Sequence, residues 1–156
     1  MMHLCSDVLK ALQGKTLVTA ESCTGGGIGA ALTAVSGSSA VYKGGIICYT
    51  NWVKENLLDV DAQILEKESA VSAPVAEMMA RGAKNRLQAD VAVSVTGLAG
   101  PGGDEFGNPV GTVFIGYCDE NICLSEKFIF SGDRESVRTQ AIRQALELVL
   151  QKAVDF

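Results

Sequence analysis

A serine and a thiol that precede a run of glycines are the first residues of this sequence that could do chemistry. The stretch "TAESCTGGG" has Ser22, Cys23 and Thr24 between a β-prone segment and a helix-compatible one. A glycine-rich turn that opens a helix presents free backbone N–H groups, and Gly25 and Gly26 would let a ligand approach them closely. The turn therefore predicts a small anion site, with local capping by a Ser22 or Thr24 hydroxyl as the simpler alternative.

Either nucleophile would need a base. Cysteine hydrolases usually use a histidine, and the chain has one histidine, His3, beside its terminus. Catalysis by Cys23 is therefore disfavoured. A serine can instead be deprotonated by a lysine, provided that burial keeps the amine neutral.

Lys54 is the most suggestive lysine. It lies on the first turn of a predicted helix that follows the apolar strand "IICYT", at the sheet edge where α/β sites gather. Trp52 could wall it off from water, although a solvated lysine paired with a nearby carboxylate is the simpler interpretation. The hydroxyls that such a lysine could reach are those of Ser38, Ser39 and Tyr49.

A second glycine-rich loop, "GLAGPGGDEFGNPVG", follows the predicted strand "ADVAVSVTG". Ser94 and Thr96 alternate onto one face of that strand, so Thr96 and Gly97 are candidates for the site. Asp104 and Glu105 make the loop tip acidic, but adjacent carboxylates on such a loop are more often solvated, and we expect no metal site.

Two arginines, Arg134 and Arg138, lie four residues apart on one face at the start of the last predicted helix. Either could bind a phosphate beside helix-start amides, or pair with a neighbouring carboxylate at the surface. The familiar nucleotide motifs are not met: the spacing Gly25-x-Gly27-x-x-Ala30 is not followed by an acidic residue about 20 positions later, and there is no P-loop sequence.

The composition limits the number of domains and the classes of ligand that these residues could bind. The chain of 156 residues is 47% hydrophobic and has a formal net charge of −5, which predicts one globular domain over residues 1–156 and argues against a nucleic-acid surface. No apolar run is long enough for a membrane span, and the N-terminus does not read as a signal peptide, so we expect a cytoplasmic protein. The five cysteines form no C-x-x-C pair and predict a reduced interior, with Cys48 and Cys118 as small core residues.

The predicted elements form an α/β fold. Strands and helices follow the order α-β-α-β-α-α-β-β-β-α, which indicates a layered α/β/α sandwich with a mixed sheet whose later strands are antiparallel. Asn51 is a plausible N-cap of the helix that carries Lys54, Pro74 marks the start of the next helix, and Ser131 or Asp133 caps the last and longest one. The strands are expected at residues 15–20, 46–50, 89–97, 111–118 and 122–130, and the helices at 4–13, 26–35, 51–60, 73–87 and 131–154.

Five blocks of the sequence, taken together, are more specific than any one glycine-rich loop. They are "TAESCTGG", "GSSAVYKGGIICYTNWVK", "SAVSAPVAEMMARGA", "SVTGLAGPGG" with "PVGTV", and "FSGDRESVRTQA". These blocks resemble the C-terminal domain of the CinA family of competence/damage-inducible proteins, in the same order and over nearly the whole chain.

Stand-alone members of that family are similar to nicotinamide-nucleotide amidohydrolases, which convert nicotinamide mononucleotide into nicotinate mononucleotide and ammonia without a metal or cofactor. The resemblance implies a catalytic Ser39–Lys54 pair, with Lys54 taking the Ser39 proton and Tyr49 orienting the lysine or relaying a proton. It also implies binding contacts from Ser22 and Thr96 and an arginine for the phosphate, where Arg138 fits slightly better than Arg134.

These expectations leave two other functions open. One is a non-catalytic nucleotide-binding or competence-associated module, and the other is an amidohydrolase that acts on a different amide. The expected ligand in each case is a small molecule, not a nucleic acid or a membrane, and we expect a homo-oligomer because small domains with sites at their edges often complete them by self-association. Glu21 has no role in these expectations.

Overall fold

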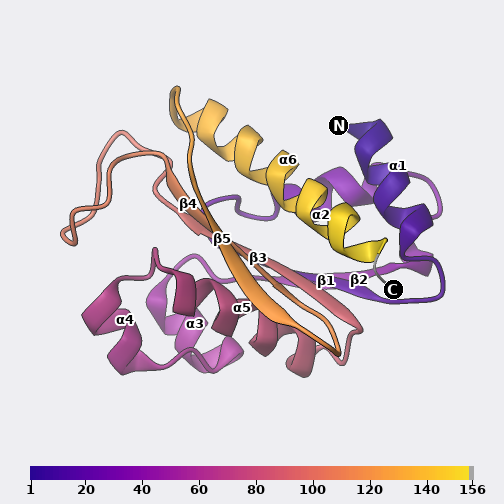
Figure 1. Cartoon of the computed structure of the whole chain (residues 1–156), viewed down its shortest axis with the longest axis horizontal. Coiled ribbons are helices and arrows are strands. Elements are labelled where there is room, and N and C mark those ends of the chain that lie inside the picture. Colours follow the sequence, from indigo (N-terminus) through magenta and orange to yellow (C-terminus); the bar gives the residue numbers. More distant parts are fainter. Residues whose placement is uncertain (155–156) are drawn as a thin grey trace.

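A five-stranded mixed sheet lies between two layers of helices in the computed structural model, which describes residues 1–154 (Figure 1). The strand order is β2-β1-β3-β4-β5, with β1 parallel to β2 and β3, and β4 antiparallel to both β3 and β5. The predicted α/β sandwich is confirmed; the remaining residues 155–156 of the expected domain lie outside the described part. The strands are β1 (Leu17–Glu21), β2 (Tyr42–Ile47), β3 (Val91–Gly97), β4 (Thr112–Cys118) and β5 (Cys123–Ile129).

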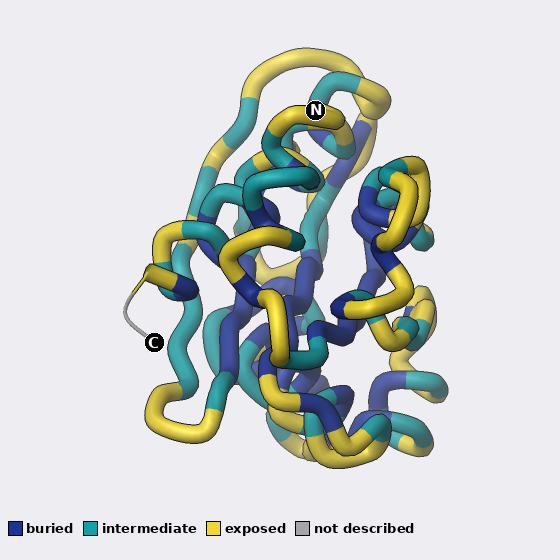
Figure 2. Tube along the Cα trace, turned by 90° about the vertical axis from the view of Figure 1, so that its right-hand side faces the viewer, coloured by how far each residue is buried: buried dark blue, intermediate teal, exposed yellow. Residues whose placement is uncertain are grey.

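Helices α1, α2 and α6 cover one face of the sheet, and α3, α4 and α5 cover the other (Figure 1). Each face therefore has its own apolar core, and the buried residues gather in the interior of the molecule (Figure 2). The central strands β1 and β3 are buried along nearly their whole length, because helices cover both faces of the sheet. The helices are α1 (Met2–Ala11), α2 (Gly27–Thr33), α3 (Asn51–Leu58), α4 (Ala62–Glu68), α5 (Ala73–Arg86) and α6 (Arg134–Ala153), with a 3₁₀ turn, η1 (Ser38–Ala40).

Strand β2 is the element for which the sequence pattern is wrong. The apolar run predicts it at residues 46–50, but it covers Tyr42–Ile47 and begins inside the glycine-containing segment predicted as a loop. Pairing with β1 decides its position, because Gly44 and Gly45 lie opposite Val18 and Thr19 in the parallel register. The shift leaves residues 48–50 as a turn that enters α3 directly.

The helices after β2 differ from expectation in two details. Thr50 is the N-cap of α3, in place of the predicted Asn51, and α4 over Ala62–Glu68 is an additional helix that the sequence pattern does not predict. Asp61 caps α4 by accepting a hydrogen bond from the backbone N–H of Gln63 at 2.8 Å. The apolar positions of α4 are too few for a periodic signal over so short a helix.

The remaining helix starts follow their local signals. Pro74 lies in the first turn of α5, and Asp133 caps α6 by accepting a hydrogen bond from the N–H of Ser136 at 2.9 Å. One cysteine expectation is wrong: Cys118 forms a disulfide with Cys123 across the β4–β5 turn. Within residues 1–154, no helix is long and apolar enough to cross a membrane.

Candidate active site

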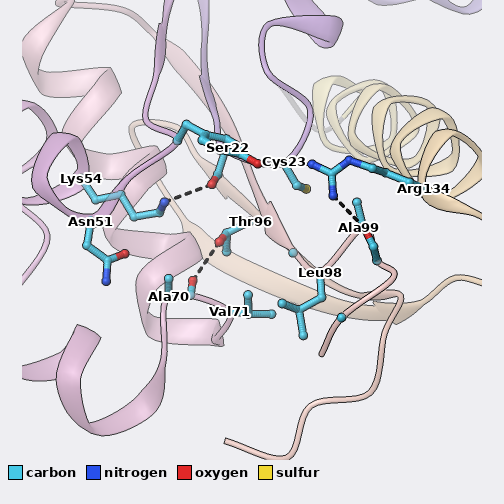
Figure 3. A pocket seen from close by; sticks show the side chains of 14 residues that line it. Ser22, Cys23, Asn51, Lys54, Ala70, Val71, Thr96, Leu98, Ala99 and Arg134 are labelled. Atoms are coloured by element: carbon cyan, nitrogen blue, oxygen red, sulfur yellow. Dashed lines mark hydrogen bonds between the residues drawn. The ribbon is translucent and has the colours of Figure 1, made fainter. Parts of the chain in front are cut away.

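A cavity of about 400 Å³ lies where β1 and β3 end, which is the edge at which the sequence predicts a site (Figure 3). Its walls come from the turn after β1, the start of α3, the α4–α5 connection, the glycine-rich loop after β3 and the first residue of α6. Among the described residues that line it, none is an aspartate or a glutamate. They are Ser22, Cys23, Tyr49, Asn51, Lys54, Ala70, Val71, Thr96, Gly97, Leu98, Ala99, Gly100, Gly102 and Arg134.

Ser22 and Lys54 meet inside this cavity. Nζ of Lys54 donates to Ser22 Oγ at 3.0 Å (Figure 3). It also donates to the carbonyl oxygen of Cys48 at 2.7 Å. Ser22 follows the last residue of β1, and Lys54 lies one turn into α3, so the short β2–α3 turn brings the lysine back over the strand end. The result is a serine hydroxyl in direct contact with an amine, as in a Ser–Lys dyad.

Lys54 is only 1% exposed. Desolvation by burial lowers the pKa of its amine, while the nearby Cys48 and Cys23 thiols oppose this effect. Trp52 does not supply the predicted wall, because it is 67% exposed. A lysine that burial drives toward the neutral form has the property that a general base requires.

Ser39 does not take part in this pair. It lies exposed in η1, before β2, whereas Lys54 follows β2, so the length of that strand separates the two residues. In place of the expected Ser39–Lys54 contact, the structure shows a contact between Ser22 and Lys54. Ser38, the other hydroxyl in that segment, is buried in the same η1 turn and does not line the cavity.

Cys23 lines the cavity beside Ser22 but is a poor nucleophile. Burial raises the pKa of its thiol to about 11, with smaller opposing effects from its own backbone, Arg138 and Lys54. The thiol is therefore protonated near neutral pH, and only a thiolate is strongly nucleophilic. That Cys23 does not carry the reaction stays a prediction.

The anion site predicted at the start of α2 is already occupied by the protein itself. The carboxylate of Glu21 accepts hydrogen bonds from the backbone N–H groups of Ile28 at 2.8 Å and Gly29 at 3.0 Å. It also accepts one from the hydroxyl of Thr24 at 2.8 Å. The helix-start amides are thus unavailable to a ligand, and Thr24, Gly25 and Gly26 do not line the cavity.

Thr96 and Gly97 line the cavity as expected, but the Thr96 hydroxyl has a partner of its own. Thr96 Oγ1 donates to the carbonyl of Ala70 at 2.8 Å and so holds the α4–α5 connection against β3. Ser94, on the same face of the strand, donates to Ala76 in α5. Thr96 therefore fixes a wall of the cavity.

The arginines at the start of α6 have different positions. Arg134 lines the cavity on the side opposite Lys54, and it donates to the Gly100 carbonyl at 2.7 Å and to the Tyr49 hydroxyl at 3.2 Å (Figure 3). Arg138 instead donates to the carbonyls of Cys23 at 2.9 Å and Thr24 at 3.1 Å. Arg134 therefore lines the cavity, whereas Arg138, the arginine slightly preferred from the sequence, does not. The hydroxyl of Tyr49 contacts Arg134, where the sequence predicts a role beside Lys54.

Sequence reasoning misses Asn51 as a cavity residue and Glu21 as the α2 cap. The pattern around Asn51 indicates a helix cap, although its i, i+3 spacing to Lys54 already puts both residues on one helix face. Glu21 gives no local signal, because its partners lie seven and eight residues further along the chain. Among the described residues there is no cluster of three or more potential metal ligands.

The sequence family follows from comparison with known proteins. The model of the CinA C-terminal domain matches residues 2–153. The chain belongs to the CinA C-terminal domain family. A CinA-like protein of Parasynechococcus marenigrum is 49% identical over 148 residues, which are 92% of this chain and 35% of that protein. A CinA-like protein of Geotalea daltonii is 50% identical over 125 residues, and the chain spans about a third of the length of the curated relatives it matches.

Solved structures of CinA superfamily proteins share the complete fold. One from Klebsiella pneumoniae has a TM-score of 0.96 at 36% identity and covers 99% of this chain and 98% of its own. The competence/damage inducible protein CihA of Agrobacterium tumefaciens has a TM-score of 0.92 at 38% identity and covers 96% of this chain and 93% of its own. The five-stranded sheet and its helical layers are therefore those of CinA superfamily structures.

Proposed function

We propose that this CinA-family domain is an amidohydrolase that converts nicotinamide mononucleotide into nicotinate mononucleotide and ammonia, with Ser22 as nucleophile and Lys54 as base. The observation that carries the proposal is the 3.0 Å contact between Ser22 Oγ and the buried Lys54 Nζ. The family resemblance suggests the substrate, and the contact supports Ser22, in place of Ser39, as the attacking residue.

The reaction begins with neutral Lys54. Its lone pair takes the Ser22 proton, while an N–H of the amine donates to the Cys48 carbonyl and holds the nitrogen in place. Ser22 Oγ attacks the carboxamide carbon, the C–N bond breaks, and Lys54 returns the proton to the leaving ammonia. Lys54 then deprotonates a water molecule, which attacks the acyl carbon. The bond to Ser22 Oγ breaks, Lys54 returns the proton to Ser22, and the nicotinate carboxyl group is released and ionises.

The attack of Ser22 places a negative charge on the carboxamide oxygen of the tetrahedral intermediate. We assign the binding of this oxyanion to backbone N–H groups of the loop after β3, because the N–H groups at the start of α2 already bind Glu21. Leu98 N–H donates to Thr112, whereas within residues 1–154 no protein acceptor takes the N–H groups of Ala99 and Gly100, which line the cavity. Removing one such donor typically costs on the order of 10² to 10³ in rate.

Arg134 provides the charge for a phosphate. A guanidinium carries five N–H donors, and in the described chain Arg134 donates to the Gly100 carbonyl and the Tyr49 hydroxyl, so it retains donors for an anion. Among the described residues that line the cavity there is no carboxylate, and Arg134 is charged while Lys54 acts as a neutral base, so the site favours a ligand with a negatively charged group. This supports a mononucleotide over free nicotinamide as the substrate.

The test is ammonia release from nicotinamide mononucleotide by the wild type and four alanine variants. Ser22→Ala and Lys54→Ala should each lose at least about 10³-fold in kcat, because a nucleophile and its base act as a unit. Ser39→Ala and Cys23→Ala should retain activity within about threefold of the wild type. Full activity in Lys54→Ala, or loss in Ser39→Ala alone, would contradict the proposal.

Two results would favour a different function for this site. Thermal stabilisation by the nucleotide with no ammonia released under any condition would indicate a binding module. Ammonia from another amide, without preference for a phosphate, would indicate a different substrate. Self-association remains a prediction of the same proposal, and sedimentation of the purified chain would measure it.

A further inference from the structure

Glu21 is a buried carboxylate that forms no ion pair with any residue of the described range 1–154. Its side chain is 2% exposed, and its oxygens accept three hydrogen bonds, from Thr24 Oγ1 and the N–H groups of Ile28 and Gly29. Burying a carboxylate is costly unless it is fully hydrogen-bonded. The three donors, two of them at the positive end of α2, meet that requirement.

Glu21 and Ser22 are consecutive but face opposite sides of the sheet. Side chains alternate along a strand, and Glu21 contacts α2 on one face while Ser22 contacts Lys54 of α3 on the other. The main chain between them is pinned on both sides: Cys48 N–H donates to the Glu21 carbonyl at 2.9 Å, and Ser22 N–H donates to Val95 at 3.0 Å. Glu21 therefore cannot touch a ligand in the cavity, yet it is the chain neighbour of the residue that can.

The turn that follows is held from its other side. Arg138 of α6 donates to the carbonyls of Cys23 and Thr24, so a cation binds the acceptors of the turn while Glu21 binds the Thr24 hydroxyl. Cys48 links the main chain at Glu21 to the base, because the Cys48 N–H donates to the backbone carbonyl of Glu21 and the Cys48 carbonyl accepts from Lys54. Serine and lysine are thus positioned by one connected set of hydrogen bonds.

We propose that Glu21 is a positioning residue for the reaction: its carboxylate locks the turn after β1 against α2 and thereby holds Ser22 Oγ within reach of Lys54. This inference rests on the proposed function of Ser22. Its chemical requirement is a group that accepts on both oxygens. The side-chain amide of glutamine would place an N–H₂ group against one of the three donors. Glu21→Gln therefore keeps the shape of the side chain but loses at least one of the three hydrogen bonds.

The first measurement is the kinetics of Glu21→Gln with nicotinamide mononucleotide. We expect kcat to fall roughly 10- to 100-fold, because a misplacement of about 1 Å costs up to 10²-fold, while KM stays within about threefold because Arg134 and its wall are untouched. Asp61→Asn is the matched control: it removes a carboxylate cap from α4, away from Ser22, and should leave kcat unchanged.

The second measurement is the reactivity of Ser22 in the absence of the proposed substrate. A fluorophosphonate probe phosphonylates an activated serine as fluoride leaves, and mass spectrometry gives the rate at Ser22. The rate should fall in Glu21→Gln in parallel with kcat. Unchanged kcat and labelling in a variant with only a lower melting temperature would overturn the inference. If the wild type releases no ammonia but Ser22 is labelled, the proposed substrate fails, and the labelling comparison still decides the role of Glu21.

A milder pair of variants covers the case in which Glu21→Gln does not fold. Thr24→Val removes one donor to Glu21 and keeps the carboxylate. It should lower kcat by about three- to tenfold, less than Glu21→Gln, because the two backbone donors to the carboxylate remain. Thr24→Ser should restore most of the activity. Equal kcat in Thr24→Val and the wild type would overturn the inference.

Discussion

Two glycine-rich segments follow the parallel strands β1 and β3, and the structure uses them in opposite ways. The turn after β1 is closed on itself, because Glu21 binds the amides of α2 and Arg138 binds the carbonyls of the turn. The loop after β3 is open toward the cavity, and Gly97, Gly100 and Gly102 line it. A run of glycines is therefore an anion site only where its amides lack a partner within the protein.

The arginines of α6 give the most direct test of this difference, because Arg138 donates to carbonyls of the turn after β1 and Arg134 donates to a carbonyl of the loop after β3. Arg134→Ala should raise KM for the mononucleotide about 10- to 100-fold with a smaller change in kcat, because the variant loses a charge-assisted phosphate contact. Arg138→Ala should mainly lower kcat, by about tenfold, because it frees the turn that carries Ser22.

Steady-state kinetics of both variants measure the split. Arg143→Ala, further along the same helix and paired at the surface with Glu147, is the control and should change neither parameter. Equal effects of Arg134→Ala and Arg138→Ala on KM would show that the two segments are not functionally distinct.

Lys54 offers a test that depends on stability and not on substrate. Burial lowers its pKa in the folded protein, so between that lowered value and the ordinary value of about 10.4 the unfolded chain binds a proton that the folded chain does not. The free energy of unfolding of the wild type should therefore rise with pH in this window relative to Lys54→Met.

Urea unfolding at several pH values measures this slope. Lys67→Met removes an exposed lysine of α4. The free energy of unfolding of this variant should depend on pH in the same way as that of the wild type. The same protonation should appear in catalysis as a rise of kcat/KM with pH, with an apparent pKa below that of an ordinary lysine. Parallel stability curves for the wild type and Lys54→Met would contradict a neutral base.

Asp104 anchors the loop after β3 and gives the smallest expected effect. Its carboxylate accepts hydrogen bonds from Ser69 at 3.0 Å and from the side chain of Asn108 at 2.7 Å. Desolvation opposes ionisation, but these bonds and those from the backbone N–H groups of Phe106 and Asn108 lower the pKa of the carboxyl. Asp104→Ala should cost roughly 1 kcal/mol at neutral pH.

This stabilisation should disappear in acid. A folded pKa below the unfolded value of about 3.9 means that the contribution is present above that value and is lost as the pH falls through the folded pKa. Unfolding at neutral pH and in strong acid measures it, with Glu105→Gln as the neighbouring control. A loss for Asp104→Ala that is independent of pH would assign the effect to packing.

The sequence by itself determined the layered α/β fold, the edge of the sheet at which the site lies, and the identity of its lysine. These follow from local signals: runs of β-prone residues, the helix start at Pro74, and a lysine just after a strand. The strand pattern predicts the start of β2 at residue 46, whereas the strand begins at Tyr42. Its glycines lower β propensity, and only pairing with β1 supplies the compensation.

Only the tertiary structure decided which serine contacts Lys54, which arginine lines the cavity and which groups Glu21 binds. Ser22 and Ser39 both lie near glycines in the sequence, but they come to lie at different ends of the sheet. Contacts between residues 32 or more than 100 positions apart, Ser22 to Lys54 and Cys23 to Arg138, have no local signal. The physical reason is that hydrogen-bond partners are chosen by distance in space, which a residue pattern along the chain does not contain.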